Sequence, residues 1–224
     1  MPLVASLIQR LRGSLGRRLI TLDELEQHLV DHTAAISQKA TWDYVRARLG
    51  VSWPQLFALP ELRDALEICR WEAYAAVLAD VAEVTQILLR RAGAPEPPLA
   101  GVLVAMAERA LVRHPVPFHR RDWNDVTESV RRRLERAALA PPKPVRLLGT
   151  LAARRVIEVL PVDDSLKRED SDFIENNIRF LLVRYYEDSE RLVDLPAVVA
   201  AIRTGGRANG GGAAGEDVDA GPTA

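Results

Sequence analysis

The sequence predicts an all-α protein: a single-domain irregular bundle of about six to eight helices with a disordered C-terminal tail. Apolar residues recur at spacings of three and four through most of residues 21–203, as they do on one face of an α-helix. No stretch of useful length alternates apolar and polar residues as a half-buried strand does. With 224 residues, 48% of them apolar, the chain is long enough to bury one core.

Residues 1–20 are predicted to form a basic amphipathic segment. Leucine and isoleucine recur in it at helical spacing, and it contains no acidic residue. The apolar run is short and interrupted by polar residues, so a secretory signal is not expected. Its four arginines are candidates for binding an anionic or membrane surface: Arg10, Arg12, Arg17 and Arg18.

A helix is expected over residues 21–50. It begins with the pattern of a capping box, Thr21 followed by Glu24, and it ends at Gly50. Its last turns carry a second apolar face besides the main stripe, so the helix end is expected to meet two neighbours. That second face supplies three candidate partner-binding residues: Trp42, Val45 and Leu49.

A long buried helix over residues 61–92 is the strongest structural expectation. It follows a short aromatic connection and is apolar around most of its circumference, which is typical of a helix at the centre of a bundle. Only a narrow wedge of this helix is polar. The acids of that wedge, Glu72, Asp80 and Glu83, are expected to face solvent.

Proline and glycine set the remaining boundaries. Residues 93–98 form a stiff break and a candidate subdomain boundary, and residues 161–168 are expected to be a loop. Residues 204–224 are rich in glycine and alanine without periodicity, and a disordered tail is expected there. The helices expected between these segments span 99–113, 122–139, 144–160, 170–193 and 196–203.

Composition argues against several classes of function. The 30 basic and 31 acidic side chains give a net charge of −1, so the chain as a whole does not attract polyanions. The high arginine and alanine content is typical of a GC-rich bacterial genome. One cysteine, Cys69, argues against a disulfide framework and suits a reducing cytoplasm. No apolar run is long enough for a transmembrane segment.

The near-neutral total conceals blocks of charge. Residues 120–155 carry ten bases against four acids, whereas residues 161–194 carry ten acids and fewer bases. Pairs within the basic block, together with the acidic block, are expected to neutralise most of its charge. A self-paired solvated face is therefore favoured over an anion-binding face.

Two arginines fall on apolar stripes and are candidate buried charges, Arg155 and Arg70. A buried guanidinium needs an acidic partner, because an unpaired buried charge is costly. For Arg155 we expect an acid of the 170–193 helix, such as Glu175, and the alternative is an anionic ligand pocket.

His28 and His32 stand four residues apart on one helix, a spacing that two metal ligands can have. Di-metal bundle sites draw a second histidine-containing pair from another helix, and none is present. A structural histidine pair at the rim of the apolar stripe is therefore favoured, and the two residues remain weak metal candidates.

The sequence favours a non-enzymatic cytoplasmic protein that binds a protein partner or another copy of itself, as an adaptor, scaffold or regulator. It shows no catalytic constellation and no phosphate-binding loop, so no cofactor is expected. No recognition-helix pattern accompanies the basic block, so nucleic-acid binding is not expected. One alternative is a peripheral protein at the inner face of the membrane, attached through its basic N-terminal segment. The other is a helical metal protein or enzyme that uses His28 and His32.

Overall fold

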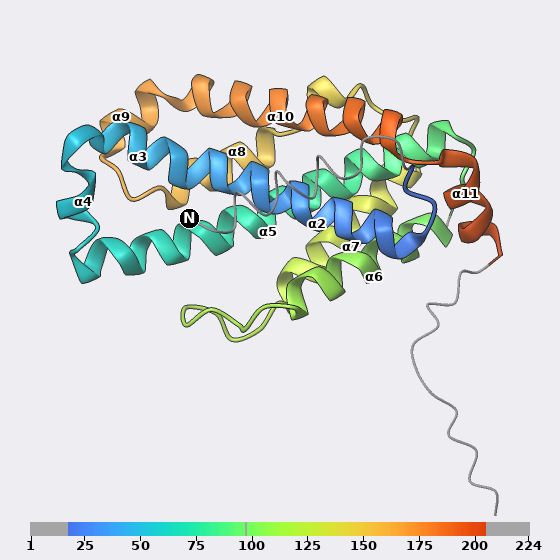
Figure 1. Cartoon of the computed structure of the whole chain (residues 1–224), viewed down its shortest axis with the longest axis horizontal. Helices are drawn as coiled ribbons and strands as arrows, with labels where there is room; N and C mark the ends of the chain where they lie inside the picture. Colours follow the sequence, from blue (N-terminus) through green and yellow to red (C-terminus); the bar gives the residue numbers. More distant parts are fainter. Residues whose placement is uncertain (1–17, 97, 205–224) are drawn as a thin grey trace, which may run out of the picture.

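The computed structural model describes residues 18–96 and 98–204, which are predominantly helical and contain no strand (Figure 1). This confirms the all-α class. The longest helix runs along most of the molecule, and the other helices pack around it. The helices within these ranges are α2 (Leu22–Gln38), α3 (Tyr44–Leu49), α4 (Trp53–Leu56), α5 (Pro60–Arg91), α6 (Pro98–Val112), α7 (Asn124–Ala138), α8 (Thr150–Val159), α9 (Asp164–Glu169), α10 (Ser171–Leu192) and α11 (Leu195–Arg203).

Helix α5 is the centre of the core, as its apolar circumference predicts. It contacts α2, α6, α7, α8 and α10, so nearly every side of its second half is covered by another helix. The buried residues on both sides of the 93–98 break belong to one hydrophobic cluster. None of the helices in the described ranges combines the length and the apolar character that crossing a membrane requires.

The expected solvent-facing wedge on α5 is wrong. Glu72, Asp80 and Glu83 retain only 4%, 0% and 3% of their surface exposed. The wedge lies beneath α7 and α8, which bring arginines over the three carboxylates. A polar stripe on a central helix therefore marks an internal ion-paired interface.

The expected helix over residues 21–50 begins with the predicted capping box. The Glu24 amide donates to Thr21 Oγ1 at 3.1 Å, and the Thr21 amide donates to Glu24 Oε2 at 3.1 Å. The helix is not uniform, because a π-helical turn over Lys39–Asp43 separates α2 from α3. Hydroxyls in this region donate to carbonyls four residues earlier, which tends to bend a helix: Thr33, Ser37 and Thr41.

After the π-helical turn, the second apolar face packs mainly inside the protein. Val45 is fully buried and belongs to the core, which corrects its assignment as a partner-binding residue. Leu49 is half-buried against the same core. Trp42 remains exposed at the surface, with its ring 4.5 Å from that of Phe57.

Two other expected boundaries differ from the structure. The helix expected over 144–160 is divided, because Gly149 has a positive φ of +96° and separates a short 3₁₀ turn (Val145–Leu147) from α8. The loop expected over 161–168 contains most of α9. Asp163 caps this helix, since its side chain accepts a hydrogen bond from the Ser165 amide at 2.8 Å.

Gly149 provides a test of this packing. An added Cβ at this position would lie 3.3 Å from Leu182 Cδ1 and 3.4 Å from Ile178 Cγ2, on top of an unfavourable left-handed backbone. We expect Gly149→Ala to lower the free energy of unfolding by about 2 kcal/mol. The matched variant Gly101→Ala lies in α6 with open space around the new Cβ, and should raise it by about 0.5–1 kcal/mol. Urea unfolding measures both changes, and equal effects of the two substitutions would contradict the left-handed conformation and close packing of Gly149.

Candidate functional site

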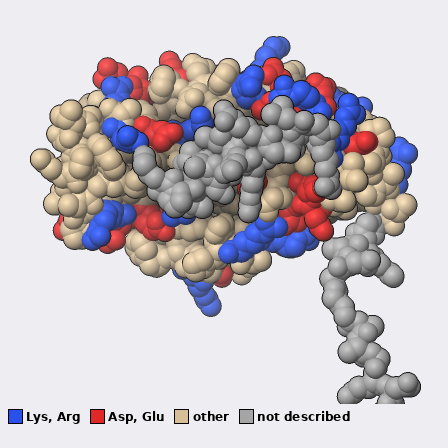
Figure 2. Space-filling view, viewed as in Figure 1, with Lys and Arg blue, Asp and Glu red and all other residues tan. Residues whose placement is uncertain are grey.

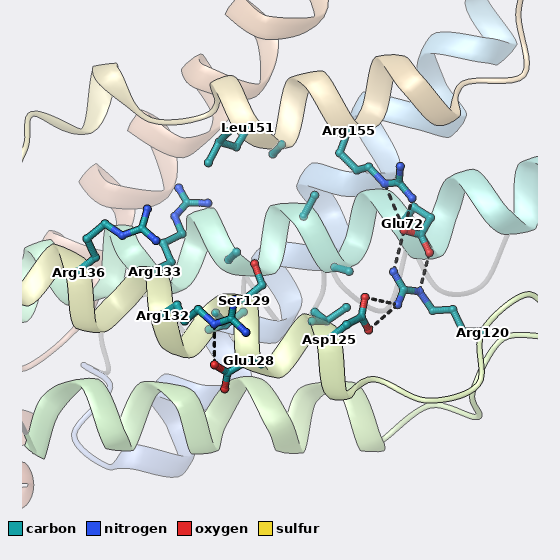
Figure 3. A pocket seen from close by; sticks show the side chains of 16 residues that line it. Glu72, Arg120, Asp125, Glu128, Ser129, Arg132, Arg133, Arg136, Leu151 and Arg155 are labelled. Atoms are coloured by element: carbon teal, nitrogen blue, oxygen red, sulfur yellow. Dashed lines mark hydrogen bonds and ion pairs between the residues drawn. The ribbon is translucent and has the colours of Figure 1, made fainter.

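A buried carboxylate, Glu72 of α5, gathers three cationic or polar side chains from outside the central helix, and Figure 3 shows two of them, Arg120 and Arg155. Arg155 of α8 donates from Nη2 to Glu72 Oε2 at 2.7 Å. Arg120, in the connection between α6 and α7, donates from Nε to Oε1 at 2.5 Å and from Nη2 to Oε2 at 2.8 Å. His119 Nε2 lies 2.9 Å from the same Oε1. The two guanidinium groups therefore meet at one carboxylate.

The electrostatics keep Glu72 ionised. Burial alone would raise its pKa, but the hydrogen bonds from Arg120, Arg155 and His119 outweigh burial and lower the pKa from 4.5 to about 2. An ionised and fully hydrogen-bonded Glu72 is a structural anchor for both arginines. It is not available as a general base at neutral pH.

A second anchor lies further along α5. Arg133 of α7 donates from Nε to Glu83 Oε2 at 2.5 Å and pairs as well with Asp80, which is fully buried. Burial raises the pKa of Asp80 above its usual range, although Arg133 opposes that shift. Lys143 approaches Glu83 from the other side at 3.9 Å. Helix α7 is thus attached to α5 through a charge that α5 alone would leave unpaired.

Arg155 is ion-paired as expected, but its side chain is 43% exposed, so it is not a buried charge, and its partner is not the predicted one. It pairs with Glu72 and Glu158, while Glu175 pairs with Arg179 of its own helix. Arg70 is not a buried charge: its side chain is 63% exposed, pairs with Glu67 at 3.6 Å and lies over the Trp71 ring. Arg70 lies on the side of α5 that faces solvent, whereas its neighbours Cys69 and Trp71 are buried.

The basic block is partly self-paired, but not with the acids of residues 161–194. Its ion pairs within the described ranges join it to α5, to α6 and to acids within the block and α8. On the face seen in Figure 2, acidic and basic side chains lie next to one another in several patches. The six bases of the block that form ion pairs are Arg120, Arg131, Arg132, Arg133, Lys143 and Arg155.

A groove of about 590 Å³ runs above these anchors. Helices α7 and α8 both pack against α5 but make few contacts with each other, so the groove lies between them. Alanines form its floor: Ala75, Ala76 and Ala79 of α5 and Ala152 of α8. Arginines line its walls: Arg120, Arg132, Arg133, Arg136 and Arg155. A neighbouring cavity of about 330 Å³ shares Arg133, Arg136 and Leu151 with it and adds Lys143.

The hydrogen-bonding capacity of the groove is uneven. At one end, Arg120 and Arg155 are occupied by Glu72. At the other end, within the described ranges, neither Arg136 nor Ser129 makes an ion pair or a side-chain hydrogen bond, and both are exposed. Arg132 lies between them, 65% exposed, and uses only Nε toward Glu128 at 2.6 Å. These three residues follow one another at spacings of three and four, so α7 presents them on one face.

The histidine pair belongs to a polar network in the core. His28 Nε2 lies 2.9 Å from Ser189 Oγ, and His32 Nδ1 donates to the His28 carbonyl at 2.9 Å. The Tyr185 ring stacks on His28, which is buried, whereas His32 is half-buried at the edge of the core. Burial lowers the pKa of His28 to about 3. The described residues hold no group of three potential metal ligands at this or any other place.

Of the four N-terminal arginines, the structure describes only Arg18, which is exposed; Arg10, Arg12 and Arg17 fall outside the described residues. Sequence reasoning missed the three α5 acids as anchors. The signal for them was present, because a polar wedge on a helix that is otherwise apolar all round requires charged partners.

Because the pKa of Glu72 is lowered in the folded protein, its contribution to the free energy of unfolding depends on pH. A folded-state pKa below the unfolded value of 4.5 stabilises the fold above about pH 4.5, and this stabilisation is lost as the pH falls toward 2. Glu72→Gln should lower the unfolding free energy by about 3 kcal/mol at pH 7, because two arginines lose their buried partner. The difference from the native protein should shrink at pH 3.

Urea unfolding at pH 7 and pH 3 measures this difference. The matched variant Glu158→Gln removes an exposed partner of Arg155 and should change stability by less than about 0.5 kcal/mol. The buried His28 is present in all three proteins, so its own pH dependence cancels in the comparison. A Glu72→Gln difference that is the same at both pH values would contradict an ionised, ion-paired Glu72.

No protein-family model matches the chain, and neither a curated protein nor a solved structure matches it. Any functional conclusion must therefore follow from the chemistry of the groove.

Proposed function

We propose that the protein is a non-enzymatic binding module that holds an acidic segment of a partner protein in the groove between α5, α7 and α8. The observation that carries this proposal is the row formed by Ser129, Arg132 and Arg136 on one face of α7, which we call the arginine row. Among the residues that the structure describes, these side chains have hydrogen-bond donors with no partner, and they lie beside an alanine floor. Guanidinium groups bind carboxylates through strong charge-assisted hydrogen bonds.

The shape of the groove favours a peptide segment. Together with the neighbouring cavity it extends along α7 from Arg120 to Lys143, which suits an extended occupant better than a single small ion. The alanine floor accepts small apolar side chains, while the arginine row accepts acidic ones. Specificity would come from alternation of these two kinds of side chain along the occupant.

The mixed charge of the groove argues against a nucleic acid as the occupant. Among its lining residues, Glu72, Asp125 and Glu128 accompany the five arginines. A phosphate backbone needs a continuous basic track, because its charges repeat along the whole strand. A peptide with a few acidic residues can place them at the arginine row and avoid the carboxylates.

The state of the nucleophilic and acidic groups supports a binding role. Glu72, Asp125 and Glu128 are all held in ion pairs with arginines. Cys69 lies in the core, where burial raises its pKa to about 12, so its thiolate is not formed at neutral pH. Within the described ranges, these groups are engaged in structure and are not poised for proton transfer or nucleophilic attack.

The proposal is tested with a short fluorescent peptide of alternating glutamate and alanine, titrated with the full chain and followed by anisotropy. Arg132→Glu combined with Arg136→Glu should weaken binding at least about tenfold, since each lost charge-assisted contact costs about 1.5–3 kcal/mol. The matched variant Arg154→Glu adds a negative charge on the exposed face of α8 outside the groove and should leave binding nearly unchanged.

A peptide of alternating lysine and alanine controls for non-specific association and should not bind. Affinity for the acidic peptide should also fall when the salt concentration rises, because the arginine row is solvent-exposed and therefore screened. Equal binding by the double variant and the native protein would refute the groove as the site.

A further inference from the structure

We infer that residues 216–219 of this chain occupy the arginine row when no partner is bound, so that the protein's own acidic segment competes with the partner. This inference rests on the proposed function, because it assigns a second occupant to the same groove. The segment lies beyond the described residues, and the case for it depends on its chemistry, its reach and the place where the described chain ends.

The chemistry of the segment matches the groove. Glu216, Asp217 and Asp219 supply three carboxylates within four residues, with the apolar Val218 between them and Ala220 after them. These are the acidic and small apolar side chains that the arginine row and the alanine floor accept. The preceding residues 205–215 consist of glycine, alanine and asparagine apart from Arg207, so no other acid lies near the segment.

The described chain ends close to one end of the groove. Arg203, at the end of α11, donates from Nη2 to the Gly93 carbonyl at 2.9 Å, just past the C-terminal end of α5. Figure 1 shows α11 at the same end of the molecule as this end of α5. The cavity that continues the groove is lined there by Ile87 and Arg90 of α5 together with Arg136 and Lys143.

The connecting residues are long enough to reach the arginine row. From Gly93 back to Ile87 is about 9 Å along a helix axis, and back to Ala79, on the groove floor, is about 21 Å. Residues 205–215 span up to about 36 Å when extended. The acidic segment therefore reaches both the Arg136–Lys143 end and the alanine floor without any displacement of α11.

Attachment to the chain makes even a weak contact effective. A tethered segment has an effective concentration on the order of 1 mM when the connection is short. If the segment alone binds with a dissociation constant of about 0.1 mM, it weakens a competing peptide about tenfold. Competition from the tail thus raises the concentration at which a partner peptide half-fills the groove.

The test uses the full chain with the substitutions Glu216→Gln, Asp217→Asn and Asp219→Asn, and the fluorescent glutamate–alanine peptide. This variant should bind the peptide about tenfold more tightly than the native protein. A matched variant, Glu61→Gln, Asp64→Asn and Asp172→Asn, changes the net charge equally at exposed acids outside the lining of the groove and should not change affinity. In the Arg132→Glu, Arg136→Glu background, the tail substitutions should have no effect.

A second probe is a labelled peptide with the sequence of residues 205–224, titrated into the full chain that carries the neutralised tail. It should bind, and the glutamate–alanine peptide should displace it. If the glutamate–alanine peptide binds the native and neutralised-tail proteins equally and the 205–224 peptide does not bind, the inference about the tail is overturned while the proposed function stands. If neither peptide binds the neutralised-tail protein, the proposed function itself fails.

Discussion

Three carboxylates on the buried central helix determine how this protein is assembled. Glu72, Asp80 and Glu83 lie on the one face of α5 that apolar packing cannot cover, and removing them from water is costly unless a cation accompanies them. Arginines from α7, α8 and the α6–α7 connection provide that charge. The outer helices on this side are therefore positioned by ion pairs as well as by apolar contact.

The same ion pairs shape the groove. Helices α7 and α8 pack directly on α5, and their arginines reach the carboxylates from either side of the acidic face. The two helices scarcely touch each other. The space between them is floored by alanines, which are too small to close it. The part of α7 that does not contribute an anchor, with Arg132 and Arg136, is left to face outward.

Much of the fold could be predicted from the sequence, because apolar periodicity, capping residues and proline specify helices locally. The long α5 and the Thr21–Glu24 capping box are examples. The interruptions were not predictable in the same way. The π-helical turn lies where hydroxyl groups bond back along the helix, and Gly149 lies in close approach to Ile178 and Leu182 of α10; neither the turn nor the contact follows from local apolar spacing. The site was predicted only in part, since the spacing of charges along the chain does not tell which helix supplies the partner of Arg155.

The insertion of Arg133 between Asp80 and Glu83 has a consequence for the motions of the protein. Helix α7 is short and amphipathic and stands at the edge of the bundle, a position in which helices commonly open locally while the core stays folded. Lifting α7 away would leave two buried carboxylates of α5 without their guanidinium. We therefore expect local opening of α7 to cost much more free energy than its place at the edge suggests, and its amide hydrogens to exchange slowly with solvent. The helix that carries Arg132 and Arg136 would then be one of the more rigid helices at the surface.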